Sequence, residues 1–331
     1  MATLLTLIAR GPWHLGKRGV GMEEVEVVLN ADTLFSALCH AWLALYGSLS
    51  DLLRGFEEGD PPFLISSGFP YDGRTRVWYP PAPLARPSLP EGVEPKKIKK
   101  ARFLPFDLWD RMRRGEQPDL SGFDTAEGFL MPVSHGDRKA QCHVPCRVEP
   151  VPHVALDRVS SRSNLYFTGQ LFFQPECGFG VLIEFRRDEW RDRVLRALEW
   201  LGETGIGGER TSGCGIFCVR EETIALEPVE SAYRILLSPY NPRDVSELAA
   251  WDLERSHYQF LVRRGYADVP GDRDPRRRSL RMFAEGSVLR LAEGPRVACG
   301  RLINLAPEGF TRHPIYRYGY AFAVEWKGTG Q

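Results

Sequence analysis

A glycine-rich stretch in the second half of the chain constrains the fold more than any other feature of the sequence. Six of the fourteen residues from 202 to 215 are glycine, and most of the others are small or polar. Apolar residues recur at helical spacing before this stretch, from Trp190 to Leu201, and residues 216–219 are typical of a short strand after it. The sequence therefore predicts a helix, a glycine loop and a strand, in that order. Phosphate loops of nucleotide enzymes run in the opposite order and end in Gly-Lys-Ser/Thr, so the pattern argues against a nucleotide site.

The composition of the loop favours contact with the backbone of a nucleic acid. Glycine has no Cβ, so it adopts positive φ and lets the main chain approach a partner closely. Successive exposed N–H groups in such turns form concavities that bind anions. Arg210, Thr211 and Ser212 add donors suited to phosphate oxygens. A merely flexible connection between two elements is the alternative interpretation.

Length and charge limit the class of protein. The chain has 331 residues, enough for two domains that each bury a core. Its 43 basic and 43 acidic residues cancel, which argues against a protein that coats nucleic acid over its whole surface but permits a local basic groove. We expect no signal peptide and no membrane contact, and the seven scattered cysteines suit a reducing cytoplasm.

The first fifty residues predict a strand, a second short strand and a helix. The apolar run at residues 4–8 predicts a partly buried strand, and the alternation over 23–29 predicts the second. Asp32 is a suitable N-cap for an amphipathic helix, and Gly47 is a suitable end for it. This order is typical of the start of a ferredoxin-like or RRM-type domain.

The next region is expected to be irregular. Residues 60–105 are rich in proline, and we expect their aromatic residues, such as Phe69, Tyr71 and Trp78, to pack on the core rather than stack on bases. A basic run follows at Lys96, Lys97, Lys99, Lys100 and Arg102. Such a run is usually a solvated face, and contact with RNA or a partner subunit is the alternative.

Histidines and cysteines gather between residues 131 and 157, at His135, Cys142, His143, Cys146 and His153. Zinc sites generally use two ligand pairs at defined spacing, and only one cysteine pair is present, with three residues between its members. The alternation over 142–149 instead favours one arm of an exposed hairpin. We therefore predict no metal and no cofactor.

A second unit is predicted after Glu222. Residues 233–237 indicate a strand, and a short helix starts at Asp244 or Ser246. Residues 276–287 run from an arginine cluster into a strand, and residues 313–322 form an aromatic, strand-like end. Alternation would place Tyr316, Tyr318 and Tyr320 on one face.

Several of these segments resemble one known family. Residues 205–215, Gly-Ile-Gly-Gly-Glu-Arg-Thr-Ser-Gly-Cys-Gly, resemble the glycine loop of the RAMP proteins of CRISPR effector complexes, although Glu209 replaces a basic residue and Cys214 an aromatic one. Residues 13–16 resemble that family's His-x-Gly turn, and residues 31–38 its Asp-Thr-Leu-Phe-Ser-Ala-Leu helix start. Residues 276–287 and 313–322 are similar to the C-terminal signatures of the Csm-complex subunit that holds the 5′ handle of the guide RNA in type III-A systems.

The resemblance implies an α+β fold with two ferredoxin-like (RRM-type, RAMP) domains. The N-terminal domain would span residues 1–221, with a long insertion and a β-thumb at about 131–154, and the C-terminal domain would span residues 222–331. Asp157 and Arg158 resemble the Asp-Arg motif that follows the thumb. The RNA-binding residues implied are His14, Gly16, Lys17, Arg18, Asp157, Arg158, Gly205, Ile206, Gly207, Gly208, Arg210, Thr211, Ser212 and Gly213.

The function implied is binding and not catalysis. The protein would grip the 5′ handle of the crRNA, beside the large polymerase-cyclase subunit and the first copy of the repeated backbone RAMP subunit. One alternative is a metal-independent endoribonuclease that processes CRISPR precursor RNA, with His14 as general base. A scaffold that binds partner subunits and no RNA is the third possibility.

Overall fold

A six-stranded antiparallel sheet organises the first two-thirds of the molecule. The computed structural model describes residues 2–16, 23–85, 100–133, 144–158, 162–267, 276–292 and 300–328. Strand β1 lies inside the sheet, between β9 and β10, and its residues from Leu4 to Ile8 are all buried. The order is β10-β1-β9-β3-β4, and β2 also pairs with β9. The strands are β1 (Thr3–Ala9), β2 (Phe63–Ile65), β3 (Phe69–Asp72), β4 (Val77–Trp78), β9 (Cys177–Phe185) and β10 (Phe217–Glu222).

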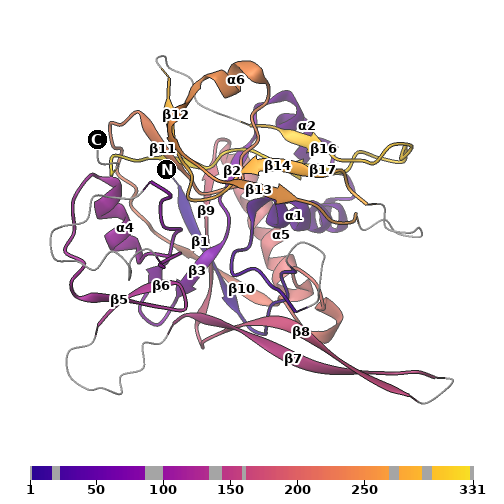
Figure 1. Cartoon of the computed structure of the whole chain (residues 1–331). Coiled ribbons are helices and arrows are strands. Elements are labelled where there is room, and N and C mark those ends of the chain that lie inside the picture. Colours follow the sequence, from indigo (N-terminus) through magenta and orange to yellow (C-terminus); the bar gives the residue numbers. More distant parts are fainter. Residues whose placement is uncertain are drawn as a thin grey trace.

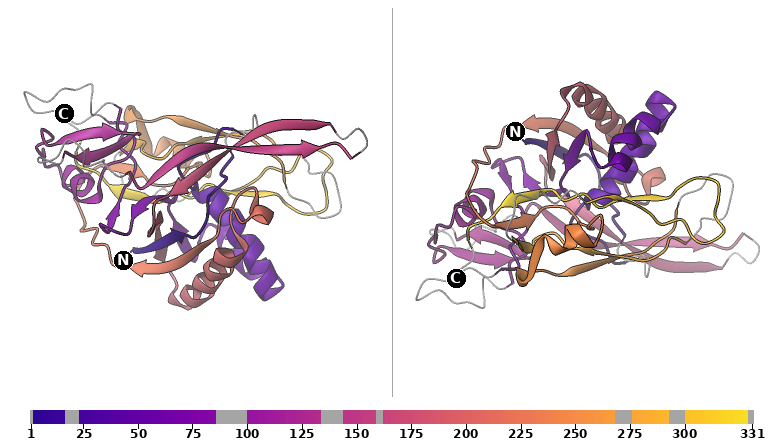
Figure 2. Two further views of the ribbon diagram at one scale, coloured as in Figure 1. Left: turned by 90° about the horizontal axis from the view of Figure 1, so that it is seen from below. Right: turned by 90° about the horizontal axis from the view of Figure 1, so that it is seen from above.

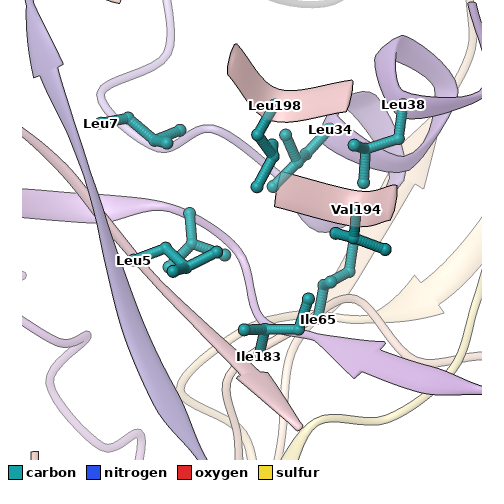
Figure 3. Close-up of a pocket in the computed structure, with 9 residues that line it drawn as sticks. Leu5, Leu7, Leu34, Leu38, Ile65, Ile183, Val194 and Leu198 are labelled. Carbon is teal, nitrogen blue, oxygen red and sulfur yellow. The ribbon is translucent and has the colours of Figure 1, made fainter. Parts of the chain in front are cut away.

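Helices α1 (Ala31–Tyr46) and α5 (Arg191–Thr204) lie against each other and cover one face of this sheet (Figure 1). Apolar side chains of both helices, such as Leu34 and Val194, meet those of β1 and β9 around a void of about 10 Å³ (Figure 3). A void of this size barely holds one water molecule, so the layer is close-packed. Helix α2 (Ser50–Glu58) follows α1.

The predicted start of α1 was wrong, and its predicted end is confirmed. Asn30 is the N-cap, and its carbonyl oxygen accepts from the N–H groups of Thr33 and Leu34 at 2.9 and 3.0 Å. Asp32 lies inside the first turn, and its carboxylate pairs with Arg263 and Arg317 of the second unit. Gly47 ends the helix in the left-handed conformation, at φ 72°.

Two segments differ from the expected local structure. Residues 23–29 form only isolated bridges, Gly16 with Val25 and Leu29 with Gly68, and not the predicted strand. Residues 63–78 supply β2, β3 and β4, so this part of the region expected to be irregular belongs to the sheet. Its aromatic side chains are buried as predicted. Helix α4 (Phe106–Arg113) and the ribbon of β5 (Phe123–Ala126) and β6 (Phe129–Pro132) follow.

A long hairpin projects from the body of the molecule (Figures 1 and 2). It pairs β7 (Cys146–Leu156) with β8 (Ser163–Phe173), from Cys146 opposite Phe173 to Leu156 opposite Ser163. The thumb predicted at 131–154 is therefore displaced, and residues 165–173 form its second arm. The eleven residues of each arm pair with the other arm along their whole length, while β9 occupies the place beside β1.

The second unit contains a four-stranded antiparallel sheet in the order β12-β15-β11-β18. Asp244, one of the two predicted starts, caps α6, and its carboxylate accepts from the N–H of Glu247 at 2.8 Å. Two further ribbons pair β13 with β14 and β16 with β17. The elements are β11 (Tyr233–Leu236), α6 (Val245–Ala249), β12 (Trp251–His257), β13 (Phe260–Arg263), β14 (Leu280–Phe283), β15 (Val288–Leu291), β16 (Leu302–Asn304), β17 (Tyr316–Tyr318) and β18 (Ala323–Glu325).

Apolar contacts join the two units into one core. Tyr318 of β17 lies 5.0 Å from Phe35 of α1, measured between ring centroids, and Tyr320 lies 5.5 Å from Phe56 of α2. The Tyr320 hydroxyl donates to the carbonyl oxygen of Phe56. Tyr318 and Tyr320 are both buried, whereas Tyr316, which was predicted to share their face, is partly exposed.

A buried carboxylate completes the contact between the units. Arg263 of β13 donates through Nε and Nη2 to the two carboxylate oxygens of Asp32, at 2.8 and 2.9 Å, and Arg317 of β17 donates to the same group. We call these three residues the Asp32 cluster. Burial alone would raise the pKa of Asp32, but the charges and hydrogen bonds of Arg263 and Arg317 lower it overall.

Replacement of Asp32 by Asn should destabilise the protein by about 3–5 kcal/mol, because it removes the carboxylate to which the guanidinium groups of Arg263 and Arg317 are hydrogen-bonded. Urea denaturation at neutral pH measures this change. Because the pKa of Asp32 is lowered in the folded protein, the stability that its carboxylate contributes is fully present above the ordinary pKa of 3.8. This stability is lost as the pH falls through the folded-state pKa. Asp51→Asn is the matched control, because Asp51 pairs with Arg54 at the surface and its loss should cost below about 1 kcal/mol. Equal losses for the two variants would contradict this account of the Asp32 cluster.

Candidate nucleic-acid interface

The turn that holds His14, the glycine loop and the start of α1 meet around a small pocket. Its volume is about 100 Å³, and its wall includes His14, Gly16, Gly207 and Gly208. Asn30 and Thr33 contribute from the start of α1, and Arg263 contributes from β13 in the second unit. The structure therefore brings together two of the three segments predicted to bind RNA.

The turn at His14 is fixed by the buried residue before it. Trp13 exchanges two backbone hydrogen bonds with Leu171 of β8, at 2.9 and 2.8 Å, and its ring stacks on Phe217 at 5.5 Å between centroids. His14 Nδ1 lies 2.8 Å from the carbonyl oxygen of Gly169. A carbonyl oxygen only accepts, so Nδ1 carries the proton, and in the neutral ring Nε2 is an acceptor.

Several glycines of the loop are required by contacts inside the protein. Gly207 has φ 98°, and a Cβ placed there would lie 2.6 Å from the carbonyl oxygen of His14. A Cβ on Gly208 would lie 2.7 Å from Cδ2 of His14, and a Cβ on Gly215 would lie 2.0 Å from the carbonyl oxygen of Ile206. The Gly208 N–H donates to the His14 carbonyl oxygen at 2.9 Å. The close approach expected of this loop is therefore made, at these three positions, to the protein's own chain.

Other backbone groups of the loop face outwards. The N–H groups of Gly205, Ile206 and Gly215 donate to carbonyl oxygens of the protein. Within the ranges that the structure describes, the consecutive N–H groups of residues 209–211 have no protein acceptor. They open the 3₁₀ turn η2 (Arg210–Ser212), which follows Glu209 in the left-handed conformation at φ 54°. Arg210, Thr211 and Ser212 are exposed, so this turn presents both backbone and side-chain donors to solvent.

The third predicted segment lies far from the pocket. Asp157 and Arg158 are exposed at the tip of the hairpin, where the Asp157 N–H donates to the carbonyl oxygen of Arg162 at 2.9 Å. Strand β8 passes the pocket at Gly169 and reaches the tip end at Ser163, six residues and about 20 Å further on. The predicted site residues Lys17 and Arg18 lie outside the described residues, as do Lys96, Lys97, Lys99, His135, Cys142 and His143.

Sequence reasoning missed the contribution of the second unit to this pocket. Arg263 donates to Asn30 Oδ1 at 3.1 Å and to Thr33 Oγ1 at 3.0 Å, in addition to Asp32. Arg263 ends a short strand, and nothing in its neighbourhood in the sequence marks it as different from other arginines. The only signal lies at Asp32: had we assigned its carboxylate to the core and not to the helix cap, a buried arginine partner would have been expected.

The remaining histidine and cysteine of the expected cluster have ordinary structural contacts. His153 Nε2 lies 2.8 Å from Thr168 Oγ1, and its ring stacks on Tyr166. Cys146 is buried, and this burial raises the pKa of its thiol. Among the described residues no group of three metal-binding side chains occurs, and no helix is long and apolar enough to cross a membrane.

Comparisons with known proteins show relatives over nearly the whole chain. Residues 229–326 match the family model of the CRISPR Csm4 C-terminal domain. The Csm4 protein of Thermococcus onnurineus is 30% identical over 301 residues, which cover 89% of this chain and 90% of the relative. The Csm4 protein of Mycobacterium tuberculosis is 27% identical over 314 residues, covering 92% and 91%.

Solved structures share the fold. A chain from the crystal structure of a Csm3–Csm4 subcomplex of the type III-A CRISPR–Cas interference complex matches with a TM-score of 0.65 and 14% identity, covering 99% of this chain and 100% of that one. A chain from a Csm1–Csm4 cassette in complex with cA4 matches with a TM-score of 0.59 and 21% identity, covering 99% and 98%.

The contact between the glycine loop and the His14 turn predicts unequal effects of two similar substitutions. Gly207 and Gly213 both have positive φ, so alanine at either position costs about 1 kcal/mol of backbone strain. Only at Gly207 does the new Cβ also collide with a carbonyl oxygen, since nothing lies within 4 Å of a Cβ at Gly213. We therefore expect Gly207→Ala to lower the melting temperature clearly more than Gly213→Ala. Equal melting temperatures would show that the loop does not pack on His14 in this way.

Proposed function

The chain belongs to the Csm4 family of RAMP-type subunits of type III CRISPR effector complexes, and we propose that it grips the 5′ handle of the crRNA. The observation that carries this proposal is the outward-facing turn at residues 209–211. Three adjacent N–H groups that find no acceptor among the described residues, next to the exposed Arg210 side chain, form a site whose chemistry suits one phosphate group.

The surroundings of this turn support a path for single-stranded RNA. The pocket beside it is lined by His14, whose Nε2 can accept a hydrogen bond from a 2′-hydroxyl or a base. Thr211 and Ser212 offer hydroxyl donors on the open side. A grip on phosphates reads little sequence, so the handle would be recognised chiefly by its backbone and shape.

We extend the proposal to the domain organisation. In the first unit the order β10-β1-β9-β3, with α1 and α5 on one face, fits a ferredoxin-like domain over residues 1–221. Residues 222–331 would form the second such domain, with β11 and β15 in its sheet. Glu222 is the last residue of β10, so the proposed boundary falls within one residue of the end of the first sheet.

The proposed partners are the other subunits of a Csm complex. The solved neighbours with the same fold come from a Csm1–Csm4 cassette and a Csm3–Csm4 subcomplex. By analogy, this chain would contact the large polymerase-cyclase subunit and the first repeated backbone subunit. The hairpin of β7 and β8 would act as the thumb, with the exposed Val154, Leu156 and Leu165 near its tip against the guide RNA. The seven cysteines suit a cytoplasmic location.

The proposed role is non-catalytic. His14 is engaged by Gly169 through Nδ1, and Gly208 lies against its ring, so the side chain has a structural task in holding the glycine loop. An endoribonuclease would need a stabiliser for the transition-state charge in addition to a general base. We expect His14→Ala to leave the maturation of guide RNA in cells unchanged, as measured by the length of crRNA in northern blots. Accumulation of uncut precursor, with normal assembly of the complex, would favour the ribonuclease alternative.

The RNA grip is tested by titration with handle-bearing RNA at several salt concentrations, followed by fluorescence anisotropy. For wild-type protein the logarithm of affinity should fall linearly with the logarithm of salt concentration. Arg210→Ala should weaken binding and reduce this slope by about 0.7, the value for one phosphate contact on a single strand. Arg196 is an exposed arginine on α5, away from the turn. Arg196→Ala removes the same charge and should change neither the affinity for RNA nor the salt slope. Wild-type protein that binds no handle RNA would overturn the proposal.

A further inference from the structure

Three arginines lie around the single carboxylate of Asp32. Two of them, Arg263 and Arg317, hydrogen-bond to it directly. The third is Arg277, whose backbone N–H donates to the carbonyl oxygen of Gly265 at 2.9 Å, two residues beyond Arg263. This bond brings the segment before β14 against the end of β13 and places Arg277 beside the Asp32 cluster.

Positive charge is concentrated at this place. Three arginine side chains lie near Asp32, and two of them share its carboxylate. Burial, together with repulsion from Arg317 and Arg263, lowers the pKa of Arg277 to about 10, while the negative charge of Asp32 acts in the opposite direction. Glu285 and Glu26 act on Arg263, but burial raises the pKa of Glu285 and so weakens it as a counter-charge.

Hydrogen-bond donors are also left over. The Nε atoms of Arg277 and Arg317 are both buried, and neither has a hydrogen-bond partner in the part of the chain that the structure describes. Among these residues Asp32 is the only carboxylate that pairs with the group, and Arg263 already uses both of its oxygens. A buried donor without a partner costs free energy, which a ligand with several acceptor oxygens would recover. Arg277 is only half-buried, so part of its side chain is open to solvent.

We propose that Arg263, Arg277 and Arg317 form a second phosphate site for the bound RNA, with Arg277 as the residue that touches the phosphate. This inference rests on the proposed function. Arg263 also lines the pocket beside Gly207, so the site adjoins the first grip and lies on the second unit. A tetrahedral oxyanion supplies both a negative charge for the arginines and acceptor oxygens for their unpaired donors. Such oxygens suit the donors of a planar guanidinium group. Free inorganic phosphate has the same chemistry as a phosphate group of RNA, and the experiment below distinguishes these two ligands.

The test compares Arg277→Gln with Arg255→Gln in the full chain. Arg255 is an exposed arginine of β12 in the same unit, and its change removes an equal charge. Handle-bearing RNA is titrated at several salt concentrations, and melting curves of the free proteins are recorded in chloride and in inorganic phosphate at equal ionic strength. We expect Arg277→Gln to reduce the salt slope by about 0.7 and Arg255→Gln to leave it unchanged. Because Arg277→Gln removes repulsion, the melting temperature of the free protein should stay constant or rise.

Four other results would each overturn the inference. An unchanged salt slope for Arg277→Gln, with wild-type binding of RNA intact, would refute the second site and leave the glycine-loop grip standing. A melting temperature that falls as far as that of Asp32→Asn would show that Arg277 only supports the fold. Stabilisation by inorganic phosphate that depends on Arg277, with an unchanged RNA slope, would assign the site to a free anion. Absence of RNA binding by the wild type would remove the proposed function and this inference together.

Discussion

The rest of the structure depends on the buried carboxylate of Asp32. A carboxylate in the interior is unfavourable unless charged donors surround it, and its donors come from β13 and β17, 231 and 285 residues away in the sequence. The same interaction therefore fixes α1 of the first unit against two ribbons of the second. Because Asn30 and Thr33 flank Asp32 and also line the pocket, the contact that joins the units shapes the candidate site as well.

The glycine loop divides into two parts with different tasks. Gly207, Gly208 and Gly215 allow the main chain to approach the His14 turn and Ile206, where any Cβ would collide with protein atoms. The N–H groups of residues 209–211 have no acceptor in the part of the chain that the structure describes, and Arg210 and Thr211 are exposed. Internal packing thus accounts for much of the glycine content, and the outward turn is the part that remains for a ligand.

Local patterns predicted the local structure well and the long-range pairing poorly. The helix, loop and strand around the glycines, the end of α1 at Gly47 and the cap of α6 at Asp244 all follow from neighbouring residues. The partner of β8 could not be predicted, since an alternating strand can pair with a hairpin arm or with a sheet. The role of Asp32 was missed because an aspartate at the start of a helix fits a cap and a buried ion pair equally well in the sequence. Only the positions of the arginines in the structure separate the two. For the site, sequence reasoning named His14 and the glycine loop as separate segments, which the structure places side by side, but it could not supply Arg263.

The central claim is that RNA lies across both units, from the glycine loop to the Asp32 cluster. Hydrogen–deuterium exchange of the full chain, with and without handle-bearing RNA, tests it most directly. The account predicts slower amide exchange on RNA binding at residues 205–216 and 276–283, and no change in α2, which lies away from the pocket. Protection confined to the first unit, or protection of α2 with exchange at 205–216 unchanged, would contradict it.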